Sequence, residues 1–335
     1  MRKLLSFVAA LAVLACGQPP QDTALLKTKA YVQENLDVLH QSAAALCDAA
    51  PVGAWSGAGD RAAIDTMKGH WKEARVAYER VEGAIAVLFP ELDAATDERY
   101  DGFLESQPDT NLFDDQVVTG VHGIERILWA DMIPAEVVTF EQGLGSKYVA
   151  AAFPATAQEA QDFKTKLCAR LVRDVKTMKD DFAPLALDTP AAFRGVIGSM
   201  EEQVEKTSFA ATGEEESRYA QHTLADMRAN LAGAMTTYDA FAPWLLSLGK
   251  ADLDARLRAG FARMKAGYDA VPGEALPRPP ATWSSLNPSA GDRMTPFGKL
   301  YTLVADETDP TRQGALVKDL TEAAEALGIP RLPAN

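Results

Sequence analysis

Residues 119–129 have the sequence TGVHGIERILW, in which apolar residues recur at the spacing of an α-helix with one buried face. His122 and Glu125 are three positions apart, and residues i and i+3 of a helix are neighbours one turn apart. Their side chains can therefore point at one small target, although this spacing also fits an ordinary hydrogen-bonded pair. Gly120 and Gly123 flank the histidine, despite a cost of about 1 kcal/mol for glycine inside a helix. We expect a neighbouring helix or a ligand to approach the backbone there.

Helical spacing continues through most of the chain and is interrupted by proline and glycine. Convincing strand patterns with alternating apolar residues are absent from the sequence. Pro184 and Pro190 bound a junction between two groups of predicted helices. The predicted fold is therefore all-α, with two packed helical bundles at residues 23–185 and 186–330. The expected helices cover residues 23–50, 61–88, 119–131, 157–182, 191–211, 214–241, 252–268, 293–305 and 311–327, with irregular segments at 92–112 and 271–289.

The N-terminus predicts export and attachment to a membrane. Arg2 and Lys3 precede an apolar run that ends at Ala15, which is the pattern of a secretory signal peptide over residues 1–15. The run is shorter than the roughly 20 residues of a spanning helix. Cys16 follows a small residue, as in a bacterial lipobox, so we expect it to be the lipidated first residue of the mature chain, with residues 16–22 as a tether. By similarity to sorted lipoproteins, the absence of Asp after Cys16 favours the outer membrane, facing the periplasm.

Charge and cysteine content limit the partners and the cross-links. The net charge of −14 disfavours nucleic acid, because phosphate backbones bind basic surfaces, and an acidic surface favours cations. After lipidation of Cys16, Cys47 and Cys168 remain. An exported protein can join them in a disulfide, which the chain-entropy model values at roughly 4–5 kcal/mol for so long a loop. Two separate buried thiols are the alternative.

A second pair of candidate ligands precedes the histidine. Glu79 and Glu82 are three positions apart on the predicted helix over residues 61–88. Helical bundles build metal sites from carboxylates and histidines that converge from facing helices. Oxygen ligands with one imidazole suit iron, manganese or calcium better than copper(I) or a structural zinc. The same Glu-x-x-Glu spacing is also common on solvated helix faces.

Three blocks of the chain resemble the imelysin-like family, which includes the EfeO/EfeM-type periplasmic iron-uptake lipoproteins. Gly120-x-His122-x-x-Glu125 is similar to the family's GxHxxE signature, and residues 71–82 look like the helix with its ExxE pair. Residues 97–99 are similar to its IDxR element, with Thr96 where isoleucine is frequent. The resemblance implies a bilobed molecule of two related bundles. It also implies one metal site, with iron as the expected ion, formed by His122, Glu125, Glu79, Glu82 and Asp97, with Arg99 orienting the carboxylates.

A further block in the second predicted bundle, residues 213–233, departs from the family pattern. The iron-uptake members have Ser-His-Thr-Asp-Leu where this chain has QHTLA at residues 221–225. Roles for His222 and Asp226 therefore stay open. The same holds for three glutamates on the preceding predicted helix, Glu201, Glu202 and Glu205.

The resemblance leaves three classes of function. Imelysin-like proteins are classed among metallopeptidases, yet the chain has no His-Glu-x-x-His helix and no Gly-x-Ser-x-Gly element. One histidine among carboxylates suits ion binding better than activation of a zinc-bound water, so no catalytic residue is assigned. We therefore expect a cell-envelope lipoprotein that binds iron or a similar cation for uptake or handover, in contact with the membrane through its lipid and with an iron permease or another envelope partner. The alternatives are a surface metallopeptidase, with Glu79 or Glu82 as its base, and a non-catalytic surface binding module.

Overall fold

The computed structural model describes residues 18–105 and 107–332 of the chain. The predicted signal peptide and Cys16 lie outside these ranges. Within them, every regular element is a helix, which confirms the all-α class. None of the helices in these ranges has both the length and the apolar character that a bilayer span requires.

The first half of the described chain forms eleven helical elements. The first begins three residues earlier than expected, inside the predicted tether, with proline in its first turn, where the missing N–H costs no hydrogen bond. The predicted helix over residues 157–182 is present as three contiguous pieces, the middle one π-helical. The elements are α1 (Pro20–Ala49), α2 (Arg61–Glu79), α3 (Glu82–Leu88), α4 (Pro90–Asp97), α5 (Tyr100–Phe103), α6 (Gly120–Leu128), α7 (Ala135–Gln142), η1 (Gly145–Lys147), α8 (Ala157–Asp162), η2 (Phe163–Cys168) and α9 (Ala169–Phe182).

The second half contributes eight elements. Residues 271–289 form the long loop that the proline-rich sequence predicts. The helix expected from residue 214 begins only at Thr223, and the segment before it is a series of turns. The elements are η3 (Pro190–Arg194), α10 (Gly195–Glu201), α11 (Gln203–Phe209), α12 (Thr223–Ser247), α13 (Ala251–Asp269), α14 (Ala290–Arg293), α15 (Pro296–Thr308) and α16 (Leu316–Ala326).

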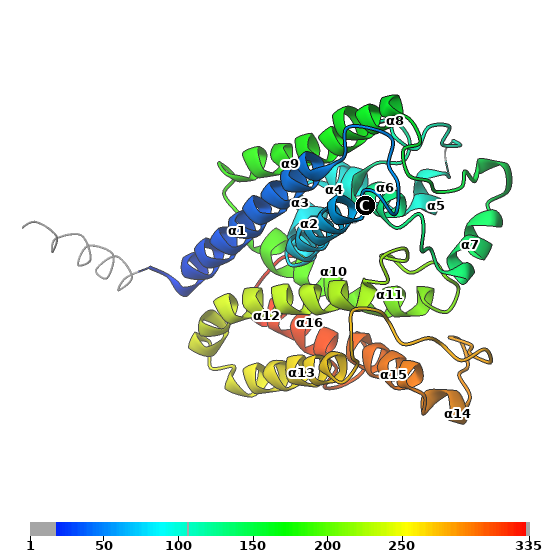
Figure 1. Ribbon diagram of the computed structural model, residues 1–335. Helices are drawn as coiled ribbons and strands as arrows, with labels where there is room; N and C mark the ends of the chain where they lie inside the picture. Colours follow the sequence, from blue (N-terminus) through cyan, green and yellow to red (C-terminus); the bar gives the residue numbers. More distant parts are fainter. Residues whose placement is uncertain (1–17, 106, 333–335) are drawn as a thin grey trace, which may run out of the picture.

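The long helices pack in layers around a continuous apolar core. Helix α1 packs against α2, α9 and α12, and α12 packs in turn against α2, α10 and α13. In Figure 1, α2, α3, α4 and α6 lie between the layer of α1 and α9 and the layer of α12 and α13. Apolar side chains from both sides of residue 185, such as Leu36, Tyr78 and Phe241, belong to one buried cluster. The division into two bundles at that residue stays a prediction.

The predicted helix over residues 61–88 is wrong in one respect, because it is broken at Arg80 and Val81 into α2 and α3. At the break, Asn230 of α12 donates a hydrogen bond of 2.8 Å to the backbone carbonyl of Glu79. Gly233, one turn further along α12, lies against the carbonyl of Arg80, and a Cβ there would come within 2.1 Å of that oxygen. In a continuous helix the carbonyl of Glu79 would accept a hydrogen bond from a backbone N–H of the next turn. Here it accepts one from the side chain of Asn230 in α12 instead.

The segment expected to be irregular over residues 92–112 contains the end of α4 and all of α5. Asp97, predicted to lie in a loop, is therefore the last residue of a helix.

Cys47 of α1 and Cys168 of η2 form a disulfide with their Cα atoms 5.7 Å apart. Of the two arrangements considered for these cysteines, the structure contains the bridge, which ties α1 to the helix beside it.

Candidate metal centre

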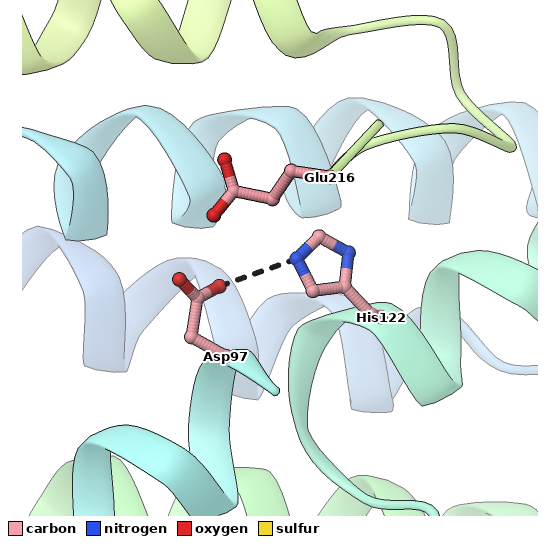
Figure 2. A group of neighbouring side chains, drawn as sticks. All are labelled: Asp97, His122 and Glu216. Atoms are coloured by element: carbon pink, nitrogen blue, oxygen red, sulfur yellow. Dashed lines mark ion pairs between the residues drawn. The ribbon is translucent and has the colours of Figure 1, made fainter. Parts of the chain in front are cut away.

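A close contact between α4 and α6 brings Asp97 beside His122. Gly120 begins α6 with φ of +71°, a conformation that favours glycine. A Cβ at this position would come within 2.2 Å of the backbone oxygen of Thr96, so only glycine allows the two helices to meet this closely. The neighbour expected at Gly120 is thus the end of α4. As a result, Nε2 of His122 lies 3.3 Å from Oδ1 of Asp97 (Figure 2).

Glu125 fixes the orientation of the imidazole from its other side. Its Oε2 lies 2.7 Å from Nδ1 of His122, and its Oε1 accepts the backbone N–H groups of Tyr219 at 3.0 Å and Ala220 at 2.7 Å. Burial raises the pKa of Glu125, and the hydrogen bond with His122 opposes that rise. A carboxylate can only accept, so Nδ1 donates in this contact, and in the neutral imidazole the lone pair is then on Nε2. Glu125, a predicted ligand, thus contacts the imidazole itself in this structure, in the position that outer partners of metal-binding histidines take.

Three side chains that could each supply a metal-ligand atom converge at the point that Nε2 of His122 faces. Asp97, His122 and Glu216 offer ligand atoms within 4.8 Å of one another, and we call them the histidine cluster. Figure 2 shows Glu216 entering from the turns before α12, opposite the other two side chains. His122 is only 1% exposed, and Nε2 has no hydrogen-bond partner among the described residues. A buried lone pair that faces two carboxylates is the arrangement that a bound cation would complete.

The predicted glutamate pair belongs to a second, overlapping group. Glu79, Glu82, Asp97 and Glu216 also offer oxygens within 4.8 Å of one another, and we call them the carboxylate cluster. Glu79 ends α2 and Glu82 begins α3, so the two lie on different helices. Both are buried.

Arg75 is one of two cations inside these clusters. It lies one turn before Glu79 on α2, is fully buried, and its guanidinium contacts Glu79 and Asp97 directly. It also lies 3.0 Å from Glu216 and 3.5 Å from Asp226. Burial opposes its charge, but these carboxylates outweigh burial and raise the pKa of Arg75 well above its usual value. Arg75 is thus an arginine in contact with the carboxylates that Arg99 was predicted to orient.

Lys206 of α11 is the second cation. Its Nζ lies 3.0 Å from Glu79, 3.5 Å from Glu82 and 2.7 Å from Glu216. The residue is only 6% exposed. Burial opposes the charge of the ammonium, yet its acidic neighbours raise the pKa of Lys206 well above the usual value.

The carboxylate cluster carries more negative charge than these two cations balance. Four carboxylates face one guanidinium and one ammonium, which leaves a surplus of two negative charges when all are ionised. Burial raises the pKa of Glu79 and Asp97, and it raises the pKa of Glu82 to about 7. Burial acts on Glu216 in the same direction, but the neighbouring ammonium and guanidinium outweigh it and hold the pKa of Glu216 well below its usual range. A divalent cation beside Nε2 of His122 would balance the surplus, so the residues fit a bound metal.

A cavity of about 310 Å³ connects the clusters to solvent. Asp97, Glu216 and Lys206 form part of its wall, so an ion that enters can reach the shared carboxylates. Arg99 lies in the same wall, with its guanidinium 4.1 Å from the ring centre of Phe209, and no ion pair to a carboxylate is found for it in the described ranges.

The residues whose roles were left open do not lie together. Glu202 and Glu205 line the cavity, and burial together with the charge of Glu82 raises the pKa of Glu202 to about 8. His222 lies outside both clusters, with its ring centre 5.7 Å from that of Trp71. Asp226 lies beside the site, 3.5 Å from Arg75. Glu201 lies in neither the clusters nor the cavity wall.

Sequence reasoning missed three residues of the site. Arg75 could have been found, because it lies four positions before Glu79 and therefore on the same helix face. Lys206 and Glu216 come from α11 and from the turns before α12, and no local pattern indicates that they meet the first half of the chain.

Comparison with known protein families gives one match. The family model described as imelysin matches residues 28–327, which include every residue of both clusters and the whole lining of the cavity. No curated protein matches the chain.

Proposed function

The chain belongs to the imelysin family, and we propose that it binds a metal cation, with iron as the expected ion, between Asp97, His122 and Glu216. The observation that supports this most strongly is the buried lone pair of His122. Glu125 holds the imidazole so that Nε2 faces two carboxylates, and Nε2 has no hydrogen-bond partner in the described part of the chain.

The donor set favours a particular class of ion. Two carboxylates and one imidazole suit divalent iron or manganese better than a soft ion such as copper(I), which prefers thiolate and thioether ligands. When its four carboxylates are ionised, the carboxylate cluster has two more negative than positive charges, and this surplus also favours a dication. Three protein donors leave open coordination positions, through which an ion can be exchanged by way of the cavity.

The proposed cellular role is uptake or handover of this ion in the cell envelope. The chain would be anchored through a lipid on Cys16, face the periplasm from the outer membrane, and pass its ion to a permease or another envelope partner. The predicted signal peptide and lipobox support this proposal. Cys16→Ser should release the protein into soluble fractions or leave an uncleaved precursor, and normal processing with membrane association would contradict the anchor.

Calorimetric titration of the purified protein with Mn²⁺, and with Fe²⁺ under anaerobic conditions, tests the binding itself. We expect one ion per chain for the wild type and loss of most of the affinity in His122→Ala. His222→Ala is the matched control, because it removes a buried imidazole outside both clusters. Absence of binding to the wild type, or unchanged binding to His122→Ala, would refute the proposed site.

Glu82 supports a second candidate function, metal-dependent peptide hydrolysis. It lines the cavity, and its pKa of about 7 is in the range of an effective general base. Against this role, Glu82 accepts a hydrogen bond of 2.7 Å from Asn230 and lies near Lys206. Cleavage of an unfolded protein that stops with a chelator and in Glu82→Gln would favour hydrolysis over binding alone.

A further inference from the structure

We propose that the turn between α12 and α13 rests on the bilayer that holds the lipid of Cys16, and that Leu246 and Leu248 make the contact. We call residues 243–250 the α12 tip. The inference rests on the lipid anchor of the proposed function, and it adds the face of the protein that meets the membrane.

The first argument is the length of the chain between the lipid and the first helix. Only Gly17, Gln18 and Pro19 separate Cys16 from the first residue of α1. Four residue steps span at most about 14 Å, because an extended chain covers about 3.3–3.6 Å per residue. A lipid on Cys16 would therefore hold the start of α1 next to the bilayer surface, together with whatever else lies at that end of the molecule.

The α12 tip lies at the same end as the start of α1. The two helices pack against each other and run in roughly opposite directions in Figure 1, where the start of α1 and the turn between α12 and α13 are both at the left. Thr28 of α1 and Thr237 of α12 line the same small cavity. From there, α1 extends about 12 Å back to its start and α12 about 15 Å on to its end, at 1.5 Å per residue. The two helix ends therefore reach nearly the same level.

The tip presents apolar side chains to its surroundings. Leu246 is 44% exposed and Leu248 is 47% exposed. Trp244 is half-buried beside Phe241, with the two ring centres 6.1 Å apart. Leucine, tryptophan and a flanking lysine, here Lys250, are residues that favour the boundary between lipid headgroups and acyl chains.

The backbone of the tip is also suited to an apolar surrounding. The N–H of Leu248 donates to the carbonyl of Leu245 at 3.1 Å, and the N–H of Gly249 donates to the carbonyl of Leu246 at 2.9 Å. Gly249 has φ of +73°, as glycine at the end of a helix commonly does. Backbone groups that are already paired do not oppose contact with lipid, where an unpaired group would be costly.

Local charge does not oppose the contact either. In residues 20–27 and 243–252 the charged residues are Asp22, Lys27, Lys250 and Asp252, all exposed, and they sum to zero. The whole chain has a net charge of −14, which an anionic membrane would repel. Two leucines bind a membrane weakly by themselves, but a short tether raises their effective concentration at its surface. Because the contact is apolar, we expect it to persist at high salt.

This orientation places the candidate metal centre away from the bilayer. Helix α12 has 25 residues and is therefore about 37 Å long. The turns that carry Glu216 precede its first residue, Thr223, at the end opposite to the tip. A partner that receives the ion would then approach from the side that faces away from the lipid anchor.

Quenching by lipid tests the contact. Residues 1–16 are replaced by a hexahistidine tag, which holds the chain on phosphatidylcholine vesicles that contain a nickel-chelating lipid, with and without brominated lipid. Ser247→Cys carries a fluorophore at the tip, and Leu286→Cys carries it on the loop over residues 271–289, where residue 286 is 99% exposed. Cys47 and Cys168 form a disulfide and do not take the label. We expect brominated lipid to quench the label at residue 247 and not the label at residue 286.

Matched substitutions identify the side chains that make the contact. Leu248→Asp should abolish the quenching at residue 247, because a carboxylate is costly at the boundary of the acyl chains. Leu286→Asp makes the same change at an exposed leucine outside the tip and should leave that quenching unchanged. Should Leu248→Asp fail to fold by circular dichroism, Leu248→Ser replaces it with the same expected loss.

The outcomes separate this inference from the proposed function. Equal quenching at the two positions, no quenching at residue 247, or quenching that high salt removes would overturn the apolar contact. A dimer in solution that Leu248→Asp dissociates would assign the tip to a second copy of the chain and would also overturn it. If the native chain is not lipidated, the anchor of the proposed function fails, but the tag replaces that anchor and the quenching still decides whether the tip meets the bilayer.

Discussion

Glu125 lies 2.7 Å from Nδ1 of His122, and its second oxygen is held by two backbone N–H groups of the segment before α12. A pair with the same spacing, His70 and Glu73, has its two side-chain atoms 3.0 Å apart on the surface, where Glu73 is 62% exposed. The spacing of three residues is therefore common to a buried site and to an ordinary surface pair. The difference lies in the tertiary contacts that hold Glu125 and leave Nε2 of His122 facing Asp97 and Glu216.

Glu125→Gln should weaken Mn²⁺ binding without unfolding the protein. An amide can still contact Nδ1, but it lacks the charge that keeps the imidazole basic, and loss of such outer partners typically costs about 10–100-fold in metal affinity. Glu73→Gln removes the same group from the surface pair and should leave the affinity unchanged. Equal affinities of the two variants in calorimetric titration would show that Glu125 does not orient the ligand.

Gly120→Ala should reduce both stability and metal affinity. The left-handed φ at this position costs about 1–2 kcal/mol for a residue with a Cβ. The clash with the backbone oxygen of Thr96 adds about 1–3 kcal/mol of overpacking and moves Asp97 away from His122.

Gly145→Ala separates the two effects of that substitution. Gly145 has φ of +66°, and a Cβ there would meet no atom within 4 Å. The Gly145→Ala variant should therefore be destabilised only by the left-handed φ, and its metal affinity should be unchanged. Urea unfolding and Mn²⁺ titration of both alanine variants measure this. An equal loss of stability in the two would contradict close packing at Gly120.

The sequence predicted those parts of the site that depend on local spacing. The pairs His122/Glu125 and Glu79/Glu82 are visible as helical neighbours, and Asp97 follows from the family resemblance. In the structure, Glu79, Glu82 and Asp97 belong to one cluster and His122 shares Asp97 with the other, while Glu125 contacts the far side of the imidazole and belongs to neither cluster. The break between those helices follows from Asn230 and Gly233 of α12, which lie more than 140 positions away and carry no local signal.

No local sequence pattern reveals Lys206 and Glu216, which add a cation and a possible metal ligand to the site. Lys206 and Glu216 reach the site from α11 and from the turns before α12, and Lys206 contacts Glu79 of α2 and Glu82 of α3. Predicting them requires the relative placement of helices, which depends on the whole apolar core. The same holds for Arg75, whose helix face was predictable but whose contacts with Asp97 and Asp226 were not.

The stabilisation by Mn²⁺ should increase with pH between about 5.5 and 8. Burial raises the pKa of Glu82 to about 7, above its usual value of 4.5. A raised carboxyl pKa means that the folded state disfavours the charged form, so without metal this group lowers the free energy of unfolding as pH rises from 4.5 through 7. A cation binds the ionised cluster and opposes that loss, while protons compete with it at low pH.

The measurement is the difference in melting temperature with and without Mn²⁺ at each pH. Glu82→Gln removes one titrating group and should make this difference depend less on pH. A shift that stays constant from pH 5.5 to 8 in the wild type would argue against ion binding near this cluster.

Removal of the bridge between Cys47 and Cys168 should destabilise the protein by up to about 4–5 kcal/mol in the chain-entropy model. The bridge closes a loop between residues 121 positions apart and joins α1 to η2. The double variant Cys47→Ser/Cys168→Ser should therefore unfold at lower urea concentration and keep its metal affinity. Denatured wild-type protein from an oxidising compartment should show neither cysteine reactive to a thiol label, and labelling of both would contradict the bridge.

The most direct test of the metal centre is a crystal grown with iron, in which anomalous scattering locates the ion. The account predicts a single peak within about 2.0–2.3 Å of His122 Nε2 and of oxygens from Asp97 and Glu216. Glu125 should remain on Nδ1, and Lys206 should remain among its carboxylates. A peak bound by Glu125 in place of Glu216, or no peak in the cavity at saturating iron, would contradict the account.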